Sequence, residues 1–256
     1  MNKILIDAKN ITKIYNENTD HALEALSDVS LIVYEGDFLC IMGPSGSGKS
    51  TLLNNISTID EPSKGILKID GKEIKLMSER EIGKFRYEKL GFIFQNYNLI
   101  ESLTIYENIA TPLSLQKKSI NNIETLVKEY TDKLMISDLL HKFPNECSGG
   151  QKQRAAICRS LVTNPKIIIA DEPTGNLDSK NSHDLLSMLK TMNNENNLAI
   201  VMVSHDAQIA SYSSKLLFIK DGKIAAQLER GNKTQKEYFY EIIQLTSSET
   251  QDLFDN

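Results

Sequence analysis

The sequence has no tryptophan, only three cysteines and no long hydrophobic run. Cys40, Cys147 and Cys158 lie far apart, and their spacing matches no metal-binding or redox motif. The longest apolar runs, such as LAIVMV at 198–203, are far shorter than the roughly 20 residues that span a bilayer. The N-terminal MNKILIDAKN lacks the continuous hydrophobic stretch of a signal peptide. We therefore expect a reduced cytosolic protein, which reaches a membrane only where another protein recruits it.

The sequence also has no excess of basic residues. Its formal net charge is −5, whereas nucleic-acid-binding proteins usually carry basic stripes. Hydrophobic and charged residues make up 40% and 25% of the chain, which are ordinary globular values. A chain of 256 residues is long enough for one large α/β domain, or for a core with a smaller subdomain. These numbers disfavour DNA or RNA as a partner.

The first third of the chain is rich in β signals, and a helical pattern follows it. ILIDAKNI, VSLIVYEGDFLCIMG and GILKIDGKEI predict strands, with a hairpin turn at Asp70-Gly71. Residues 119–140 predict a helical insert, because the apolar residues there recur at close to helical spacing. These apolar residues are Ile123, Leu126, Val127, Tyr130, Leu134 and Ile136.

Helices and strands alternate in the last part of the chain. QKQRAAICRSLV and SHDLLSMLKTM predict helices, and KIIIADE and LAIVMVSHD predict strands. The runs IIIA and AIVMV lack polar alternation, as is typical of parallel strands that helices cover on both faces. A final hairpin turns at Asp221-Gly222, EYFYEIIQL predicts an amphipathic helix, and the closing SSETQDLFDN is polar enough to fray.

The strongest motif is GPSGSGKS at 43–50, which fits the phosphate-loop pattern G-x-x-x-x-G-K-[ST] between a strand and a helix. Its glycines allow backbone N–H groups to face phosphate oxygens, and the following helix adds its positive end. Lys49 would reach the β and γ phosphates, and Ser50 would bind Mg²⁺. We predict a nucleoside triphosphate site rather than an unliganded glycine-rich turn. Its predicted contacts are Gly43, Pro44, Ser45, Gly46, Ser47, Gly48, Lys49, Ser50 and Thr51.

The strand KIIIADE supplies acidic partners for this loop. Asp171 would lie beside the Mg²⁺, and Glu172 would lie near the γ phosphate, where water attacks. Consecutive residues of a strand point to opposite sides, so that one carboxylate can serve the metal and the other the water. The alternative is an ordinary acidic turn at the end of a strand.

A second glycine-rich helix start, NECSGGQKQR, lies about a hundred residues after the first loop, at 145–154. One mononucleotide site does not need two glycine-rich helix starts. If two copies pair head to tail about a twofold axis, each copy's Ser148, Gly149 and Gly150 can face the γ phosphate that the other copy holds. Two ATP molecules would then be buried between the protomers.

Together these motifs resemble the nucleotide-binding subunits of ATP-binding cassette (ABC) transporters. The resemblance covers nearly the whole chain and includes six motifs in one order: the phosphate loop, FIFQNYNL, CSGGQ, IIIADE, GNLD and VSHD. It implies an α/β P-loop NTPase fold, with a mostly parallel core sheet, an N-terminal antiparallel β subdomain and a helical subdomain. It also implies an ATPase domain over residues 1–230, with a helical insert at about 96–160, and a C-terminal helical tail over 231–256.

The resemblance implies further site residues. It implies that Gln95 contacts Mg²⁺ and the attacking water, and that it couples them to a membrane partner. It puts Gln151 in the signature that faces the nucleotide, Asp178 in the loop that crosses the dimer, and His205 on the γ phosphate. Tyr15 occupies the position of an aromatic residue that stacks on adenine, and simple packing is the alternative for it.

The sequence is similar to the branch that contains LolD, MacB, FtsE and BceA, which pair with force-transmitting permeases. SYSSKLLFIKDGKIAAQLERG and the tail KEYFYEIIQL are most similar to BceA-type ATPases, which serve resistance to, and sensing of, antimicrobial peptides such as bacitracin and lantibiotics. The resemblance implies an ATP- and Mg²⁺-dependent homodimer, peripheral on the inner face of the cell membrane. Its partner there would be an integral permease of the FtsX, MacB or BceB type.

Other classes are weighed against this interpretation. Soluble ABC ATPases of DNA repair or translation generally carry tandem cassettes, coiled-coil arms or zinc insertions, none of which the sequence contains. A kinase or GTPase would use the phosphate loop alone and leave CSGGQ, Asp178 and His205 without a role. FtsE-like control of cell-wall hydrolases, or LolD- and MacB-like export of lipoproteins or macrolides, would use the same chemistry and stays open.

Overall fold

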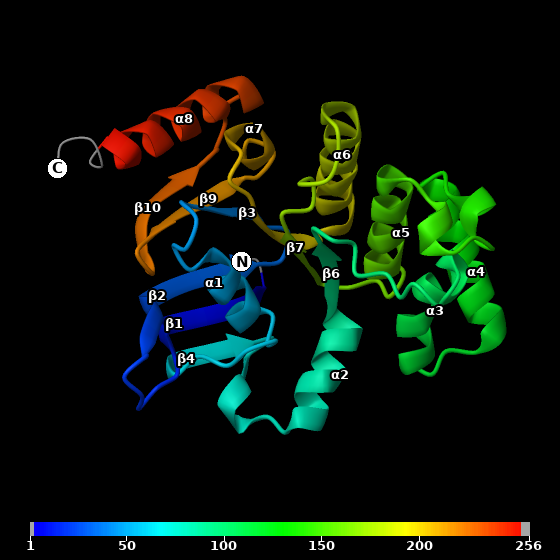
Figure 1. Ribbon diagram of the computed structural model, residues 1–256, viewed down its shortest axis with the longest axis horizontal. Helices are drawn as coiled ribbons and strands as arrows, with labels where there is room; N and C mark the ends of the chain where they lie inside the picture. The colour runs from blue at the N-terminus through cyan, green and yellow to red at the C-terminus, as the bar shows by residue number, and fades with distance from the viewer. Residues whose placement is uncertain (1–2, 252–256) are drawn as a thin grey trace. The chain divides into compact units, whose positions relative to one another are not determined.

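The computed structural model (Figure 1) describes residues 3–251. The chain divides into two compact units. The first unit comprises residues 1–76 and 186–256, and the second comprises residues 77–185. The first unit is therefore built from both ends of the chain. One boundary between the units falls within α6 (Ser179–Asn196).

The first unit contains an antiparallel sheet with the strand order β2-β1-β4-β5. Its strands are β1 (Ile4–Tyr15), β2 (Leu23–Tyr34), β4 (Lys64–Ile69) and β5 (Lys72–Glu73). The turn between β4 and β5 has φ of 49° at Asp70 and 80° at Gly71. Positive φ at both central residues is what the type I′ turn of a two-residue hairpin requires, which confirms the predicted turn.

The first unit also contains four strands of a mostly parallel sheet: β3 (Phe38–Met42), β8 (Ala199–Val203), β9 (Lys215–Lys220) and β10 (Lys223–Glu229). β3 runs parallel to both β8 and β9, and β10 pairs with β9 in the predicted antiparallel hairpin at Asp221-Gly222. Every residue of β3 and β8 is buried, as expected for strands that are covered on both faces. The helices of this unit are α1 (Lys49–Ile56), α7 (Ala207–Ala210) and α8 (Gln235–Gln251), with a 3₁₀ turn at Ile74–Leu76.

The second unit is mainly helical around the parallel pair β6 (Leu90–Phe94) and β7 (Ile167–Asp171). Its helices are α2 (Glu79–Lys89), α3 (Ile105–Leu115), α4 (Ile120–Lys133) and α5 (Gly149–Leu161), with 3₁₀ turns at Ser137–Leu139 and Pro144–Glu146. α5 packs closely on β6 at Gly91, where a methyl group would lie 2.4 Å from the Ser160 carbonyl oxygen. Only glycine allows this close approach.

The observed helices differ from those predicted from the sequence in three places. The helix predicted over 119–140 ends at Lys133, because Met135 has φ of 54° and turns the chain, although Leu134 and Ile136 remain buried. α2 was not predicted, since Ile82 is its only buried residue and the sequence has no apolar stripe there. The predicted C-terminal helix is present and extends to Gln251, into the polar segment that begins at residue 247 and for which fraying stays a prediction, and residues 252–256 lie outside the described part.

The two kinds of sheet and the surrounding helices confirm the predicted α/β class. Within residues 3–251, no helix combines the length and the apolar character that crossing a bilayer requires.

Candidate functional site

The predicted site residues fall into two sets, one in each unit. In the first unit, the loop at 43–48 joins β3 to α1, and Gly43, Gly46 and Gly48 have φ of 151°, 78° and 101°. A methyl group at Gly43 would lie 2.0 Å from the Ile219 carbonyl oxygen, and one at Gly48 would lie 2.5 Å from that of Ala25. Glycine is therefore required for the backbone conformation and for the close approach of neighbouring strands.

α1 begins directly after this loop, with Gly48 as its N-cap. No side chain caps its first turn, and that turn has no acidic residue. Because the first N–H groups of a helix have no partners within the helix, this end favours an anion. The Lys49 ammonium donates a hydrogen bond to the Pro44 carbonyl oxygen at 2.7 Å, and Ser50 is exposed. The loop therefore presents a cation, a hydroxyl and N–H donors, which suit phosphate.

Tyr15, the predicted adenine contact, is the last residue of β1 and is half-buried. The Lys13 ammonium lies 5.1 Å from the centre of its ring, and the Tyr15 hydroxyl donates to the Asp60 carboxylate at 3.1 Å. Lys13 also pairs with Asp60 at 2.6 Å. One face of the ring is thus occupied by Lys13, and stacking on adenine through the other face stays a prediction.

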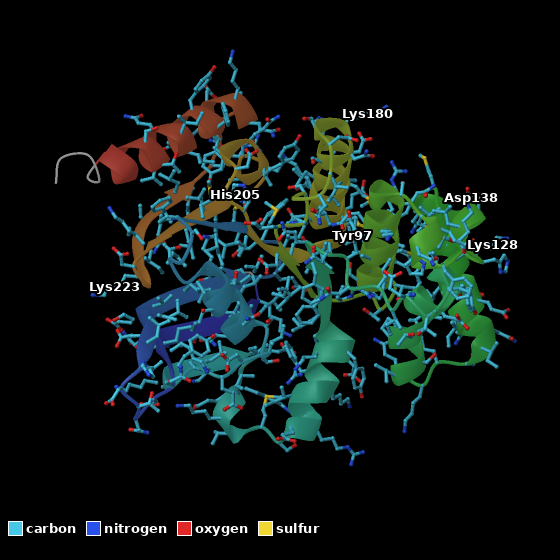
Figure 2. All side chains as sticks on the ribbon, viewed as in Figure 1. Tyr97, Lys128, Asp138, Lys180, His205 and Lys223 are labelled. Carbon is cyan, nitrogen blue, oxygen red and sulfur yellow. The ribbon has the colours of Figure 1, made fainter. Side chains whose placement is uncertain are left out.

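His205 follows β8, which ends at Val203, and its side chain is exposed (Figure 2). Its neighbours on both sides are held firmly. Ser204 is buried and its hydroxyl accepts a hydrogen bond from the Asp206 N–H at 3.1 Å, while the Asp206 carboxylate caps α7. The backbone of His205 is therefore restrained.

In the second unit, β7 ends at Asp171, and Glu172 lies just beyond it with φ of 43°. The prediction that both carboxylates alternate on one strand is therefore wrong for Glu172. A non-glycine residue in this left-handed region costs of order 1–3 kcal/mol, and such strain persists only where the surroundings impose it. The Gly175 N–H donates to the Glu172 carbonyl oxygen at 3.0 Å, and the Gln153 side chain donates to that of Pro173 at 2.6 Å.

The signature residues begin α5, and Ser148 is its N-cap. The Ser148 hydroxyl accepts from the Gln151 N–H at 3.3 Å, and the Gln151 side-chain oxygen accepts from the Ser148 N–H at 2.8 Å. This reciprocal pair is a capping box. Gln151 thus has a local role in starting the helix, and its predicted contact with a nucleotide stays a prediction.

Gln95 and its loop contact the segment that follows Glu172. The Asn176 side chain donates to the Gln95 carbonyl oxygen at 2.8 Å, and a methyl group at Gly175 would lie 2.7 Å from the Gln95 side-chain nitrogen. The hydroxyl of Tyr97 reaches the start of α5, where a methyl group at Gly149 would lie 3.0 Å from it. Within this unit, the glutamine loop, the signature and the GNLD loop therefore form one contiguous cluster.

Asp178 caps the start of α6. Its carboxylate accepts from the Asn181 N–H at 2.8 Å and from the Asn181 side chain at 2.7 Å. These backbone and side-chain hydrogen bonds hold the pKa of Asp178 below its ordinary value. The side chain is therefore an anion at neutral pH.

Several supporting residues could not be predicted from the sequence, because single Asn, Gln, Tyr or Arg residues carry no motif. Their only signal was their nearness in sequence to a motif: Tyr97 follows Gln95 by two residues, and Gln153 lies on the signature helix. Arg159, also on α5, donates to the carbonyl oxygens of Tyr97 and Asn98 and so fixes the glutamine loop. The residues missed are Tyr97, Gln153, Arg159, Asn176 and Asn181.

Comparison with known proteins shows which family the chain belongs to. The sequence pattern of the ABC transporter family matches residues 26–175. The chain belongs to the ABC transporter family. The bacitracin export ATP-binding protein BceA of Halalkalibacterium halodurans is 45% identical over 93% of this chain and 94% of its own. The ABC transporter ATP-binding protein YxdL of Bacillus subtilis is 43% identical over 93% of this chain and 91% of its own.

The fold of this ABC ATPase agrees with solved cassettes. The dimeric structure of the Methanocaldococcus jannaschii cassette MJ0796 bound to ADP and Pi has a TM-score of 0.82 with 38% identity, and the match covers 88% of this chain and 98% of that one. These findings confirm the predicted ABC ATPase fold, ATP binding and ATP hydrolysis. The contacts of individual residues with ATP stay predictions.

The predicted Mg²⁺ ligands have suitable chemistry. Ser50, Asp171 and Gln95 offer a hydroxyl, a carboxylate and an amide oxygen, and Mg²⁺ prefers such hard oxygen ligands. Ser50 is exposed at the start of α1, and Asp171 is partly exposed at the end of β7. With a few protein oxygens, Mg²⁺ usually keeps water and substrate phosphates as its other ligands.

Proposed function

We propose that this ATPase is the motor of an ABC transporter, which dimerises around two ATP molecules and drives a membrane permease. The supporting observation is α5: its glycine-rich start resembles a second anion site, and one mononucleotide site does not need two glycine-rich helix starts. A second nucleotide, held by a partner copy, gives this helix end a ligand. The dimeric MJ0796 cassette supports the same arrangement.

Each of these residues would have its own role in ATP hydrolysis. Lys49 and the N–H groups of the phosphate loop bind the phosphates, and His205 contacts the γ phosphate. Glu172 accepts a proton as water attacks that phosphate. A bound Mg²⁺, held by Ser50, Asp171 and Gln95, would neutralise charge on the phosphates.

Hydrolysis would also open the dimer. Ser148, Gly149 and Gly150 of one copy contact the γ phosphate that the other copy binds, so release of that phosphate removes a ligand that both copies share. Asp178 lies in the loop that crosses between the copies. The resulting opening is the motion that a permease would use.

We expect Ser148→Arg to bind ATP in the monomer but to prevent ATP-driven dimerisation, because the larger side chain occupies the place of the partner's nucleotide. The substitution also removes a helix cap, which costs about 1 kcal/mol. Ser78→Arg is the matched control, since Ser78 and Glu81 form the same capping box on α2. Sedimentation of both variants with ATP, in a Glu172→Gln background, measures the dimer. An ATP-driven dimer that persists in Ser148→Arg contradicts the proposed role of the signature.

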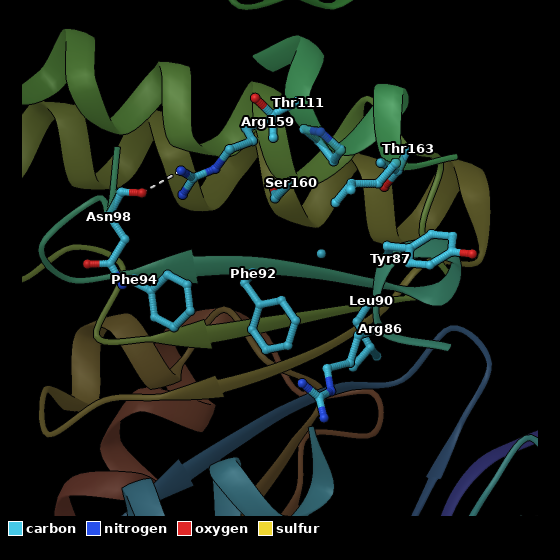
Figure 3. A pocket seen from close by; sticks show the side chains of 13 residues that line it. Arg86, Tyr87, Leu90, Phe92, Phe94, Asn98, Thr111, Arg159, Ser160 and Thr163 are labelled. Atoms are coloured by element: carbon cyan, nitrogen blue, oxygen red, sulfur yellow. Dashed lines mark hydrogen bonds between the residues drawn. The ribbon is translucent and has the colours of Figure 1, made fainter. Parts of the chain in front are cut away.

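A groove in the second unit is the proposed docking site for the permease. It has a volume of about 350 Å³ and lies among α2, β6, α3 and α5 (Figure 3). Phe92 and Phe94 of β6 and Arg159 of α5 are among its lining residues, and Arg159 donates to the Asn98 carbonyl oxygen at one end of it. Because Phe94 and Asn98 flank Gln95, a segment seated here would displace the glutamine loop directly.

We propose resistance to, or sensing of, cell-wall-directed antimicrobial peptides as the purpose of the transporter, because BceA is 45% identical and named for bacitracin export. Cells that lack this ATPase should then be more sensitive to bacitracin or lantibiotics. Tagged Glu172→Gln protein, recovered from solubilised membranes with Mg-ATP, should bring down a permease with a large extracytoplasmic domain. Recovery of cell-wall hydrolase regulators would favour an FtsE-like function, and unchanged sensitivity with a permease present would favour LolD- or MacB-like export.

A further inference from the structure

The C-terminal helix α8 is the one sequence motif that the ATPase reaction leaves without a role. It packs on α7, the short helix that follows His205 (Figure 1). Tyr238 is 0% exposed and is the largest fully buried side chain of the described residues. Two positions along the same helix, Tyr240 is 57% exposed. α8 therefore uses one face to bind the body of the first unit.

α7 needs such a support. It has only four residues, Ala207–Ala210. A single helical turn is unstable alone, because the first turn fixes several residues for one hydrogen bond. The Asp206 cap favours the turn locally, but packing must supply the remaining stabilisation. Since His205 directly precedes this cap, any loosening of α7 reaches His205.

α8 supplies that packing through specific contacts. The Gln235 side chain donates to the hydroxyl of Ser211, the residue that ends α7, at 3.1 Å. The Tyr238 hydroxyl interacts with the Ser213 side chain and lies 3.4 Å from the Leu228 carbonyl oxygen. Ser211 and Ser213 are buried, and each donates to a carbonyl oxygen within the α7 turn.

The backbone on the other side of His205 is held by β3. The Ser204 N–H donates to the Ile41 carbonyl oxygen at 3.2 Å, and Ser204 immediately precedes His205. Tyr238 therefore supports the histidine from its C-terminal side, through α7.

We propose that α8, through Tyr238 and Gln235, positions His205 for ATP hydrolysis. Tyr238 is a positioning residue, because its buried side chain acts through α7 and not on the nucleotide itself. This inference rests on the proposed role of His205.

The test compares kcat and KM for ATP in Tyr238→Ala, with Tyr240→Ala as the matched control on the exposed face. We expect kcat to fall about tenfold in Tyr238→Ala with KM nearly unchanged, since small misplacements of a catalytic group cost rate. Tyr240→Ala should behave like the parent chain. Tyr238→Phe should restore kcat, because the ring fills the same space and the 3.4 Å hydrogen bond is long.

Proton NMR of the imidazole rings distinguishes a change at His205 from a general loss of stability, which would not change the His205 signal alone. The sequence has four histidines, so loss of one signal in His205→Ala assigns His205. Tyr238→Ala should shift or broaden that signal alone and leave those of His21, His141 and His183 in place. If Tyr238→Ala does not fold, Gln235→Ala, which removes only the bond to Ser211, is judged by the same criteria.

The outcomes separate the two proposals. A normal His205 signal and a normal kcat in a folded Tyr238→Ala protein overturn the role of α8. If His205→Ala itself turns over ATP normally, the proposed role of His205 fails and this inference fails with it. If both single variants are slow and the double variant is no slower than His205→Ala, Tyr238 acts through His205.

Discussion

Glu172→Gln is expected to bind ATP as the parent chain does, and to hydrolyse it at least about 100-fold more slowly, the usual contribution of a general base. Glutamine keeps the size of the side chain and its hydrogen-bonding capacity but cannot accept a proton from water. The left-handed backbone at Glu172, with φ of 43°, is held by Gly175 and by the Gln153 contact with Pro173, so the side chain should keep its direction. The loss should therefore appear in kcat.

Phosphate release by purified protein measures this effect, and ATP binding is measured separately by calorimetry. Glu101→Gln, an exposed glutamate of the same unit, is the control for the loss of one negative charge. Turnover within a few-fold of the parent chain would remove Glu172 as the general base. In that case another group near the γ phosphate must activate the water.

Lys49→Ala is expected to weaken ATP binding by about 10- to 150-fold, the range for losing a hydrogen bond to a charged group. The Lys49 ammonium already lies over the phosphate loop, where it donates to the Pro44 carbonyl oxygen. α1 has no acidic residue in its first turn and no side-chain cap, so its first N–H groups still face the phosphates in the variant, but the charge of the ammonium is lost. Turnover should fall together with binding.

The matched control is Lys72→Ala, which removes an exposed lysine from the β4–β5 hairpin of the same unit. Calorimetric titration with ATP should give the parent affinity for this control. An unchanged affinity in Lys49→Ala would mean that the loop does not hold the β and γ phosphates as proposed. Lys49→Ala and Glu172→Gln thus separate binding from chemistry: the first should lose both, and the second should lose turnover alone.

The nucleotide chemistry was predictable because contiguous residues encode it. In GPSGSGKS, the glycines set the backbone, the lysine supplies the charge and the serine supplies the hydroxyl, all within eight positions. The hairpins at Asp70-Gly71 and Asp221-Gly222 were predictable for the same reason, since a type of turn depends on the φ angles of two adjacent residues.

Other features depended on residues far apart in the sequence. Glu172 was expected on the strand, but β7 ends one residue earlier, and the contact from Gln153 supports the chain just after it. The apolar pattern of the helical insert continued to Ile136, although the helix ended at Lys133, because a buried residue can lie on a turn as well as on a helix. The supporting roles of Tyr97 and Asn176 required the fold that brings them to Gly149 and Gln95.

The sequence by itself therefore determined the family, the phosphate loop and the order of the motifs, because each of these depends on local backbone chemistry. Only the tertiary structure decided how Tyr97 meets the signature, where Glu172 is held and what the C-terminal helix packs on. Such contacts join residues tens to hundreds of positions apart, and only the packing of the whole chain brings them together. Tyr238 is the clearest case: its sequence neighbours predict a helix, while its complete burial and the packing of α8 on α7 are what relate that helix to His205.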